Sequence, residues 1–223
     1  MEVTYFRPQR TGPETQIENA VINQIMDFFP TGDRPIWTAG SLPIGAGMPD
    51  LVVVSCEPEV FALVHVEMPS TEILAYLRAV RHARLKTIAE RVGQPREIIV
   101  RCLDNLVEVE AVTVGSKTFS LHPTWREILP EIVTIEAKVK NWRDAIAQAA
   151  RNRVFAHRSF VALPQHLAKR VRSEPIFKRL GIGLLSVSDC CDVRVLRRPR
   201  RCQPRVWTYY YKLASIAASH FRN

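Results

Sequence analysis

Two charged residues on one short strand are the first candidates for chemistry in this 223-residue chain. Glu136 and Lys138 lie two positions apart in the apolar stretch IVTIEAKV, and the helical stretch WRDAIAQAARNR follows closely. Side chains two apart on a strand point to the same face, so a carboxylate and an ammonium group would meet in one place. Such a pair can form a metal site with a charged neighbour. The alternative interpretation is an exposed strand whose outer face carries Glu and Lys for solubility.

A second acidic residue opens another apolar strand upstream. In the stretch GAGMPDLVVVS, a glycine-rich bend and Pro49 precede Asp50, and β-branched residues follow. A short apolar run bounded by turn residues predicts a buried central strand. A carboxylate at the mouth of such a strand needs a partner for its charge, and a divalent cation would serve. No His or Cys accompanies the carboxylates, which favours Mg²⁺ or Mn²⁺ over zinc.

Together these features resemble the restriction-endonuclease-like, or PD-(D/E)XK, superfamily of nucleases. The family signature is a Pro-Asp pair, an E-x-K triplet on the adjacent strand and often a Gln on the following helix. The matching residues here are Pro49, Asp50, Glu136, Lys138 and Gln148. The resemblance covers the first helix, the two strands and the helix after them. It implies a mixed α/β sheet flanked by helices and Mg²⁺-dependent hydrolysis of phosphodiester bonds in DNA.

The resemblance also implies a role for each matched residue. Asp50, Glu136 and the backbone carbonyl of Ala137 would bind one or two Mg²⁺ (or Mn²⁺) ions. Lys138 would orient the attacking water or help to deprotonate it. Gln148 would hydrogen-bond that water or the lysine. The alternative for Gln148 is a helix residue that faces solvent.

The first predicted helix, which begins near Glu14, adds two more acidic candidates. Ile17, Val21 and Ile25 recur at helical spacing and predict a buried face. Glu14 and Glu18 lie four positions apart and therefore share a side of the helix. In the resembled family a Glu of the first helix often lies beside the metal; Glu18 is the first candidate and Glu14 the second. Alternatively, both are partly exposed and stabilise the helix start through its dipole.

The segment between the two acidic strands is longer than the resembled family normally has, which predicts an insertion. Ser70 and Thr71 are candidate N-caps, Gly93 is a candidate helix end and Pro95 suits a first turn. Alternating residues on both sides of 115–117 predict a hairpin. Three helices and a hairpin make a winged helix-turn-helix. The predicted division is residues 1–67 for the first part of the nuclease core, 68–127 for the inserted winged helix and 128–223 for the rest of the core with a basic C-terminal region.

The predicted third helix of the insert offers residues that suit DNA. Arg96, Arg101 and Asn105 lie outside its apolar stripe, where Arg and Asn can read guanine and adenine edges, and Lys117 lies in the hairpin turn. The alternative is a module for dimerisation or protein docking. Residues 70–122 hold eight Lys and Arg against six Asp and Glu, which is a weak balance for binding phosphates.

The basic character of the chain is concentrated near its C-terminus. The net charge is +9, and residues 151–223 hold sixteen Lys and Arg against three Asp and Glu. Arg198, Arg200 and Arg201 are candidates for neutralising phosphates, and the aromatic residues 207–211 are candidates for stacking on bases. The alternative is a solvated basic loop, with the aromatic residues packed under a terminal helix.

Composition and length indicate the class of protein and its expected location. The chain is 47% hydrophobic and 24% charged, and it contains no apolar run long enough to cross a bilayer and no signal-peptide core. A soluble, intracellular (cytoplasmic) protein is expected, with double-stranded DNA as partner.

A homodimer is expected because cutting both strands takes two sites. A non-catalytic winged-helix regulator on a nuclease-like scaffold is the main alternative function, and cleavage of RNA or of branched junctions is another.

Overall fold

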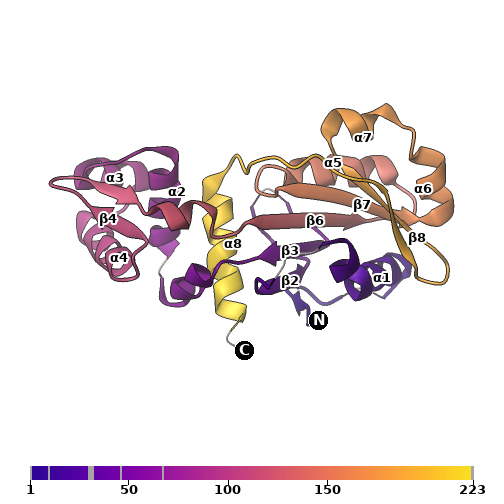
Figure 1. Cartoon of the computed structure of the whole chain (residues 1–223), viewed down its shortest axis with the longest axis horizontal. Helices are drawn as coiled ribbons and strands as arrows, with labels where there is room; N and C mark the ends of the chain where they lie inside the picture. The colour runs from indigo at the N-terminus through magenta and orange to yellow at the C-terminus, as the bar shows by residue number, and fades with distance from the viewer. Residues whose placement is uncertain (1, 10, 30–32, 46, 67, 222–223) are drawn as a thin grey trace. The chain divides into compact units, whose positions relative to one another are not determined.

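The computed structural model describes residues 2–9, 11–29, 33–45, 47–66 and 68–221. Two compact units divide the chain (Figure 1). The first unit consists of residues 1–55 and 131–205, and the second consists of residues 56–130 and 206–223.

The first unit is built on one mixed sheet, which has seven strands within the described residues. In spatial order the strands are β1 (Thr4–Tyr5), β2 (Ile36–Gly40), β3 (Leu51–Ser55), β6 (Glu131–Ala137), β7 (Arg158–Pro164), β8 (Gly183–Val187) and β9 (Val193–Arg197). β6, β7 and β8 run parallel, whereas β3 is antiparallel to both β2 and β6, and β9 is antiparallel to β8. The predicted α/β class with a mixed sheet is therefore confirmed.

Helices cover both faces of this sheet. They are α1 (Pro13–Phe28), α5 (Trp142–Asn152), α6 (Gln165–Val171) and α7 (Pro175–Leu180). α1 packs on the face that carries Val53, Ile135 and Phe160, whereas α5, α6 and α7 pack on the face that carries Val161 and Leu163. Successive strand residues alternate between the faces, so Glu136 lies on the α5 side of the sheet.

Local sequence explains where several of these elements begin and end. α1 starts directly after Gly12 with a proline in its first turn, and α7 ends at Gly181, whose φ of 65° is left-handed. A side chain at position 181 would also displace the guanidinium of Arg153, which adds to the preference for glycine that the positive φ sets. The predicted strand and helix around Glu136 are present as β6 and α5. β1, β2, α7 and β9 were not predicted.

The second unit contains three helices followed by a hairpin, with further helical segments around them. Its elements are η1 (Pro58–His65), α2 (Met68–Ala79), α3 (Leu85–Val92), α4 (Arg96–Glu108), β4 (Val112–Val114), β5 (Phe119–Leu121), η2 (Pro123–Glu127) and α8 (Trp207–His220). The apolar stripe predicted for the third helix consists of Ile98, Ile99, Cys102, Leu103 and Leu106. All of these residues are buried except Ile98, which is half-buried. Gly93 ends α3 in a left-handed conformation, as predicted.

The sequence predicted that Ser70 and Thr71 cap a helix, but neither residue does so. α2 already begins at Met68, so both residues lie inside its first turn and are buried. The Thr71 hydroxyl donates a hydrogen bond to the Met68 carbonyl at 2.8 Å. The hydroxyl is therefore used within the helix, and the cap prediction was wrong.

Two of the aromatic residues of α8, Tyr210 and Tyr211, are packing residues, whereas Trp207 and Tyr209 are half-buried. The Tyr210 hydroxyl accepts a hydrogen bond from the Leu129 N–H at 2.7 Å, and the Tyr211 hydroxyl donates one to the Trp125 carbonyl at 2.8 Å. Both rings are buried, so they are not available for stacking on bases, and the alternative interpretation holds for them. These contacts also explain why residues 206–223 fall in the second unit. The sequence had predicted that these residues belong to the core and that the insert starts at residue 68.

The chain leaves the sheet and returns to it at adjacent positions. Ser55, the last residue of β3, is paired with Glu131, the first residue of β6. The Glu131 N–H also donates a hydrogen bond to the Ser55 hydroxyl at 3.1 Å. Residues 56–130 thus connect two neighbouring antiparallel strands, in the place where a hairpin turn would otherwise lie.

His157, just before β7, is a buried histidine whose protonation should make the stability of the fold depend on pH. It is buried, and its Nδ1 accepts a hydrogen bond from the Ile132 N–H at 3.0 Å. Burial, and then the charges of Arg201 and Arg158, lower the pKa of His157 to about 3. The unfolded chain binds a proton near pH 6.5 and the folded chain does not, so the free energy of unfolding falls as the pH drops below that value.

As the pH falls from about 7.5 to about 5, we expect protonation of His157 in the unfolded chain to lower the free energy of unfolding by about 2 kcal/mol. Other groups titrate in the same range, so the test compares urea unfolding of the wild type with that of His157→Asn, whose carbonyl can still accept the Ile132 hydrogen bond. The variant should lose less stability on acidification than the wild type. An equal pH dependence of the two proteins would contradict the prediction.

Candidate functional site

The pairing of β3 with β6 brings the two predicted acidic residues together. Leu51 pairs with Ile135, so continuing the register by one residue places Asp50 opposite Glu136. Residues opposite each other in an antiparallel pair project to the same face, with their Cβ atoms about 5 Å apart. At this separation the charge of Asp50 helps to raise the pKa of Glu136.

Asp50 is held by the strand that carries its partner. Its Oδ2 accepts a hydrogen bond from the Ala137 N–H at 2.8 Å and lies 3.4 Å from the Nζ of Lys138. Its backbone carbonyl accepts a hydrogen bond from the Ser41 N–H at 3.0 Å, which extends the contact with β2. Burial raises the pKa of Asp50 above its ordinary value, although the charge of Lys138 opposes this.

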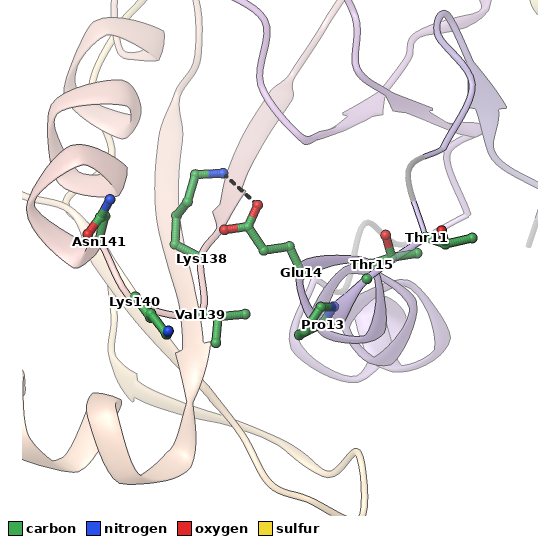
Figure 2. Close-up of a pocket in the computed structure, with 9 residues that line it drawn as sticks. Thr11, Pro13, Glu14, Thr15, Lys138, Val139, Lys140 and Asn141 are labelled. Atoms are coloured by element: carbon green, nitrogen blue, oxygen red, sulfur yellow. Dashed lines mark hydrogen bonds and ion pairs between the residues drawn. The ribbon is translucent and has the colours of Figure 1, made fainter.

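The ammonium group of Lys138 lies among oxygen atoms. It donates to the Ala137 carbonyl at 3.0 Å and forms an ion pair with Asp50 Oδ2 at 3.4 Å. It also forms an ion pair with Glu14 Oε2 at 3.4 Å (Figure 2). The side chain is 19% exposed. Burial would lower the pKa of Lys138, but the surrounding carboxylates outweigh it, so the pKa lies above its ordinary value. Lys138 is therefore a cation at neutral pH and is not a proton acceptor in this arrangement.

Glu136 is the most deeply buried acidic group of the site, with 2% of its surface exposed. Its Oε1 accepts a hydrogen bond from the side-chain amide of Asn152 at 2.6 Å. Burial, and then the charge of Asp50, raise the pKa of Glu136 to about 8. A carboxyl group with this pKa is mostly protonated at neutral pH, and a bound cation would stabilise its charged form.

The two glutamates of α1 occupy different positions in the site. Glu14, the second candidate, contacts Lys138 directly. Glu18, the first candidate, accepts a long hydrogen bond of 3.5 Å from Gln9. Burial, and then the charge of Asp50, raise the pKa of Glu18 to about 7. Both residues are thus brought to the same end of the sheet as Asp50.

Two amide side chains of α5 face the same region. Gln148 and Asn152 lie four residues apart and therefore share a side of the helix. Gln148 Oε1 is buried and has no hydrogen-bond partner among the described residues. No role was predicted for Asn152, the residue that holds Glu136. Its spacing from Gln148 was the available signal, because a second amide one turn onward must face the same strand.

Asn152 also contacts the loop that precedes Asp50. A Cβ atom added at Gly47 would lie 3.3 Å from Asn152 Oδ1, so this amide oxygen packs closely against the glycine backbone. Asn152 thus touches both acidic segments of the site. A side chain at position 47 would need this amide to move.

The oxygen atoms of the site suit a hard divalent cation. Asp50, Glu136 and the Ala137 carbonyl are oxygen donors without a neighbouring imidazole or thiolate, which is the chemistry that Mg²⁺ and Mn²⁺ prefer. Among the residues that the structure describes, no group of three His, Cys, Asp or Glu side chains is arranged to hold a metal ion. The third donor would have to be the backbone carbonyl, which here accepts the hydrogen bond from Lys138.

A pocket adjoins Lys138. It has a volume of about 480 Å³ and lies between the first turn of α1 and the loop that follows β6 (Figure 2). Thr11, Glu14 and Thr15 line it on the helix side, and Lys138 and Lys140 line it on the loop side. The two lysines make it a place where an anionic group could approach the carboxylates.

The predicted nucleic-acid-binding residues lie in both units. In the second unit Arg96, Arg101 and Lys117 are exposed, and Asn105 is half-buried. In the first unit Arg198, Arg200 and Arg201 are all exposed on one irregular segment that follows β9.

No family model, no curated protein and no solved structure matches this chain. Within the described part of the chain, none of the helices combines the length and the apolar character that crossing a membrane requires.

Proposed function

We propose that this chain is a Mg²⁺-dependent nuclease that hydrolyses phosphodiester bonds of double-stranded DNA, with a restriction-endonuclease-like core and an inserted winged helix. One observation carries the proposal. Oxygen atoms of Asp50, Ala137 and Glu14 converge on the ammonium group of Lys138, beside the buried carboxyl group of Glu136. Such a cluster has a high affinity for positive charge, and its donors are those of a magnesium site.

The side chains would divide the chemistry among them. Asp50, Glu136 and the Ala137 carbonyl would hold Mg²⁺, which when bound supplies positive charge to the attacked phosphate and makes water a better nucleophile. Lys138, which is charged, would orient the phosphate and offset its developing negative charge. Glu18, with a pKa of about 7, suits the role of proton acceptor.

Gln148 has a place in the same scheme. Its buried amide oxygen has no hydrogen-bond partner among the described residues, and such an acceptor is costly to leave unsatisfied. The attacking water or the ammonium group of Lys138 would supply the missing donor. This is the role that the resemblance to the nuclease superfamily implies for this residue.

The winged-helix part of the proposal rests on the second unit. Three helices lead into a hairpin, and Ala83, between α2 and α3, pairs with Phe119 of the hairpin, which adds a third short segment to the small sheet. α4 would be the helix that enters the major groove, with Arg96 and Arg101 exposed on it. Dimerisation or protein docking through the same unit is the alternative.

The test is cleavage by the purified full chain. Supercoiled plasmid, linear duplex, branched DNA and RNA are incubated with Mg²⁺, with Mn²⁺ or with EDTA, beside Asp50→Asn and Lys138→Ala. The proposal expects metal-dependent cleavage of duplex DNA that both variants lose. Double-strand breaks rather than nicks would favour paired sites in a homodimer. Equal products from the variants and the wild type would mean a contaminating nuclease and would remove the support for this site.

A second candidate function is DNA binding without cleavage, on a nuclease-like scaffold. The observation in its favour is that Lys138 itself neutralises the oxygen atoms that would bind a metal. A scaffold of this kind would bind duplex DNA equally well in Mg²⁺ and in EDTA and would cleave none of the four substrates.

Asn152 gives a test of how Glu136 is held. Asn152→Ala removes the donor that contacts Glu136 Oε1, and partners of this kind typically change metal affinity or activity by about 10- to 100-fold. We expect cleavage by Asn152→Ala to need a higher Mg²⁺ concentration and Asn152→Gln to recover part of the loss. The measurement is the rate of cleavage against Mg²⁺ concentration, with Asp144→Asn as an exposed control on the same helix. An unchanged Mg²⁺ requirement in Asn152→Ala would contradict this role.

A further inference from the structure

An exposed segment rich in arginine borders the first unit at the end of the sheet away from the carboxylates. We call residues 198–205 the arginine segment. It holds four arginines, and residues 193–205 contain no Asp or Glu. Its arginines are Arg198, Arg200, Arg201 and Arg205, and all four are exposed.

The backbone of the arginine segment is hydrogen-bonded to residues that lie just before β7 and β8 and just after α5. The N–H groups of Arg200, Cys202 and Arg205 donate hydrogen bonds to the carbonyls of Gly181, His157 and Val154 at 3.0, 3.0 and 2.8 Å. Pro204, which lies between the anchored residues Cys202 and Arg205, is buried. The segment therefore has no regular secondary structure but is anchored at three points. Binding a ligand would cost little ordering of the backbone.

These anchors place the segment at one defined end of the sheet. Gly181 and His157 lie just before β8 and β7, and Arg201 contacts Glu131, the first residue of β6, at 3.3 Å. The carboxylate site lies at the other end of β6, where Glu136 and Lys138 are found. At about 3.3 Å per strand residue, the two regions are roughly 20 Å apart.

We infer that the arginine segment binds the sugar–phosphate backbone of a nucleic acid, as a contact separate from the carboxylate site. This inference rests on the proposed function, since it supplies a second contact for the same substrate. Arginine presents a planar fork that matches phosphate oxygens and remains charged at every physiological pH. Four such groups on one fixed segment suit a ligand with closely spaced negative charges, as a nucleic acid backbone has.

The surface chemistry favours a nucleic acid over a protein or a membrane. Among the described residues, none of the exposed large hydrophobic side chains lies within the arginine segment. Protein interfaces depend on buried aromatic or aliphatic anchors, and membrane-bound segments insert apolar side chains. Glu131, which forms an ion pair with Arg201, also forms one with Arg158, so one carboxylate faces two guanidinium groups there.

The separation from the carboxylate site has a consequence for the substrate. A duplex that contacts both regions must span roughly 20 Å, which is about six base pairs at 3.4 Å each. Short duplexes that fill the carboxylate site alone would lack the contact with the arginine segment. Binding should therefore strengthen when the duplex becomes long enough to reach both regions.

The test measures binding of the full chain to fluorescent duplex DNA in EDTA, where no cleavage occurs, over a range of KCl concentrations. The variant Arg198→Gln with Arg200→Gln and Arg205→Gln removes three charges and leaves the Arg201–Glu131 ion pair in place. The control, Lys169→Gln with Arg170→Gln and Arg172→Gln, removes three exposed charges on and just after α6. Each lost phosphate contact should lower the salt slope by about 0.9, so the first variant should lose a slope of about 2 to 3 and bind at least about tenfold more weakly.

The outcomes separate this inference from the proposed function. A loss confined to the arginine-segment variant supports the inference, even if the wild type never cleaves DNA. An equal loss in the control variant would show a general effect of net charge and would overturn the inference, as would unchanged binding. Cleavage by the wild type together with normal binding by the variant would leave the proposed function standing and reject the arginine segment. Poly-glutamate or anionic vesicles that compete with the duplex as well as unlabelled DNA does would also overturn the inference.

Discussion

Glu136→Gln should abolish metal-dependent cleavage and at the same time make the metal-free protein more stable. The glutamine keeps the size of the side chain and an oxygen that can accept the hydrogen bond from Asn152, but it cannot carry a negative charge. Without that charge the site would lose several kcal/mol of metal binding and transition-state stabilisation, so we expect a loss of roughly 1,000-fold or more in the cleavage rate.

The gain in stability follows from the raised pKa of Glu136. The folded chain holds the proton up to a pKa of about 8, whereas a glutamate in the unfolded chain releases it near 4.5. The folded state therefore binds more protons between these values, and the wild type loses stability as the pH rises through them. Glutamine has no such dependence. In EDTA near pH 8.5 we expect the variant to be more stable by about 1–3 kcal/mol, and near pH 4.5 the difference should largely vanish.

Two measurements check this prediction. Urea unfolding in EDTA at the two pH values gives the stability difference, and thermal unfolding with and without Mg²⁺ gives the contribution of the metal. Mg²⁺ should raise the melting temperature of the wild type and leave that of Glu136→Gln unchanged. A variant that is less stable than the wild type at high pH, or that still responds to Mg²⁺, would show that Glu136 is not a metal-binding carboxylate.

Lys138→Met should separate metal binding from cleavage. The methionine fills similar space without a charge, so the oxygen atoms that now bind the ammonium group become available to a cation. We expect the variant to bind Mg²⁺ about 2- to 10-fold more tightly, because a competing positive charge is gone. Cleavage should nevertheless fall by about 100- to 1,000-fold, since the group that offsets charge on the phosphate is lost.

The matched control is Lys140→Met, since Lys140 is exposed and lines the same pocket without an ion pair to the carboxylates in the described structure. Mg²⁺ titration followed by thermal unfolding, beside the rate of duplex cleavage, distinguishes the two roles. Weaker Mg²⁺ binding in Lys138→Met would mean that the lysine supports the carboxylates structurally. Cleavage by Lys138→Met at the wild-type rate would remove Lys138 from the chemistry.

The sequence predicted the parts of the site that depend on short-range patterns. Asp50 at the mouth of a buried strand and Glu136 with Lys138 on another could be found because strand periodicity and turn residues are local signals. The sheet pairing that brings them together joins residues far apart in the chain, and the nuclease resemblance, rather than periodicity, suggested it. Asn152 was missed for a related reason, because an amide on a helix reveals its partner only after the helix is packed on the sheet.

The boundaries of the elements and units were harder to predict. Serine is a common N-cap residue, yet α2 begins before Ser70. Residue propensities therefore predicted the helix but not the residue at which it starts. β2 and β9 were missed, since strands at or near the edge of a sheet carry weak alternation. The basic charge near the C-terminus suggested that the neighbouring tyrosines stack on the bases of a nucleic acid. The hydrogen bonds that Tyr210 and Tyr211 make within the second unit could not be inferred from charge.

The pairing of Ser55 with Glu131 makes the intervening region an exchangeable cassette. Its two ends lie on neighbouring strands about 5 Å apart, a distance that a tight turn of a few residues can close. Evolution could therefore replace residues 56–130 with another module without disturbing the register that aligns Asp50 with Glu136. Such an exchange has to include α8 as well, because this terminal helix buries its tyrosines against the cassette and would otherwise expose them to water.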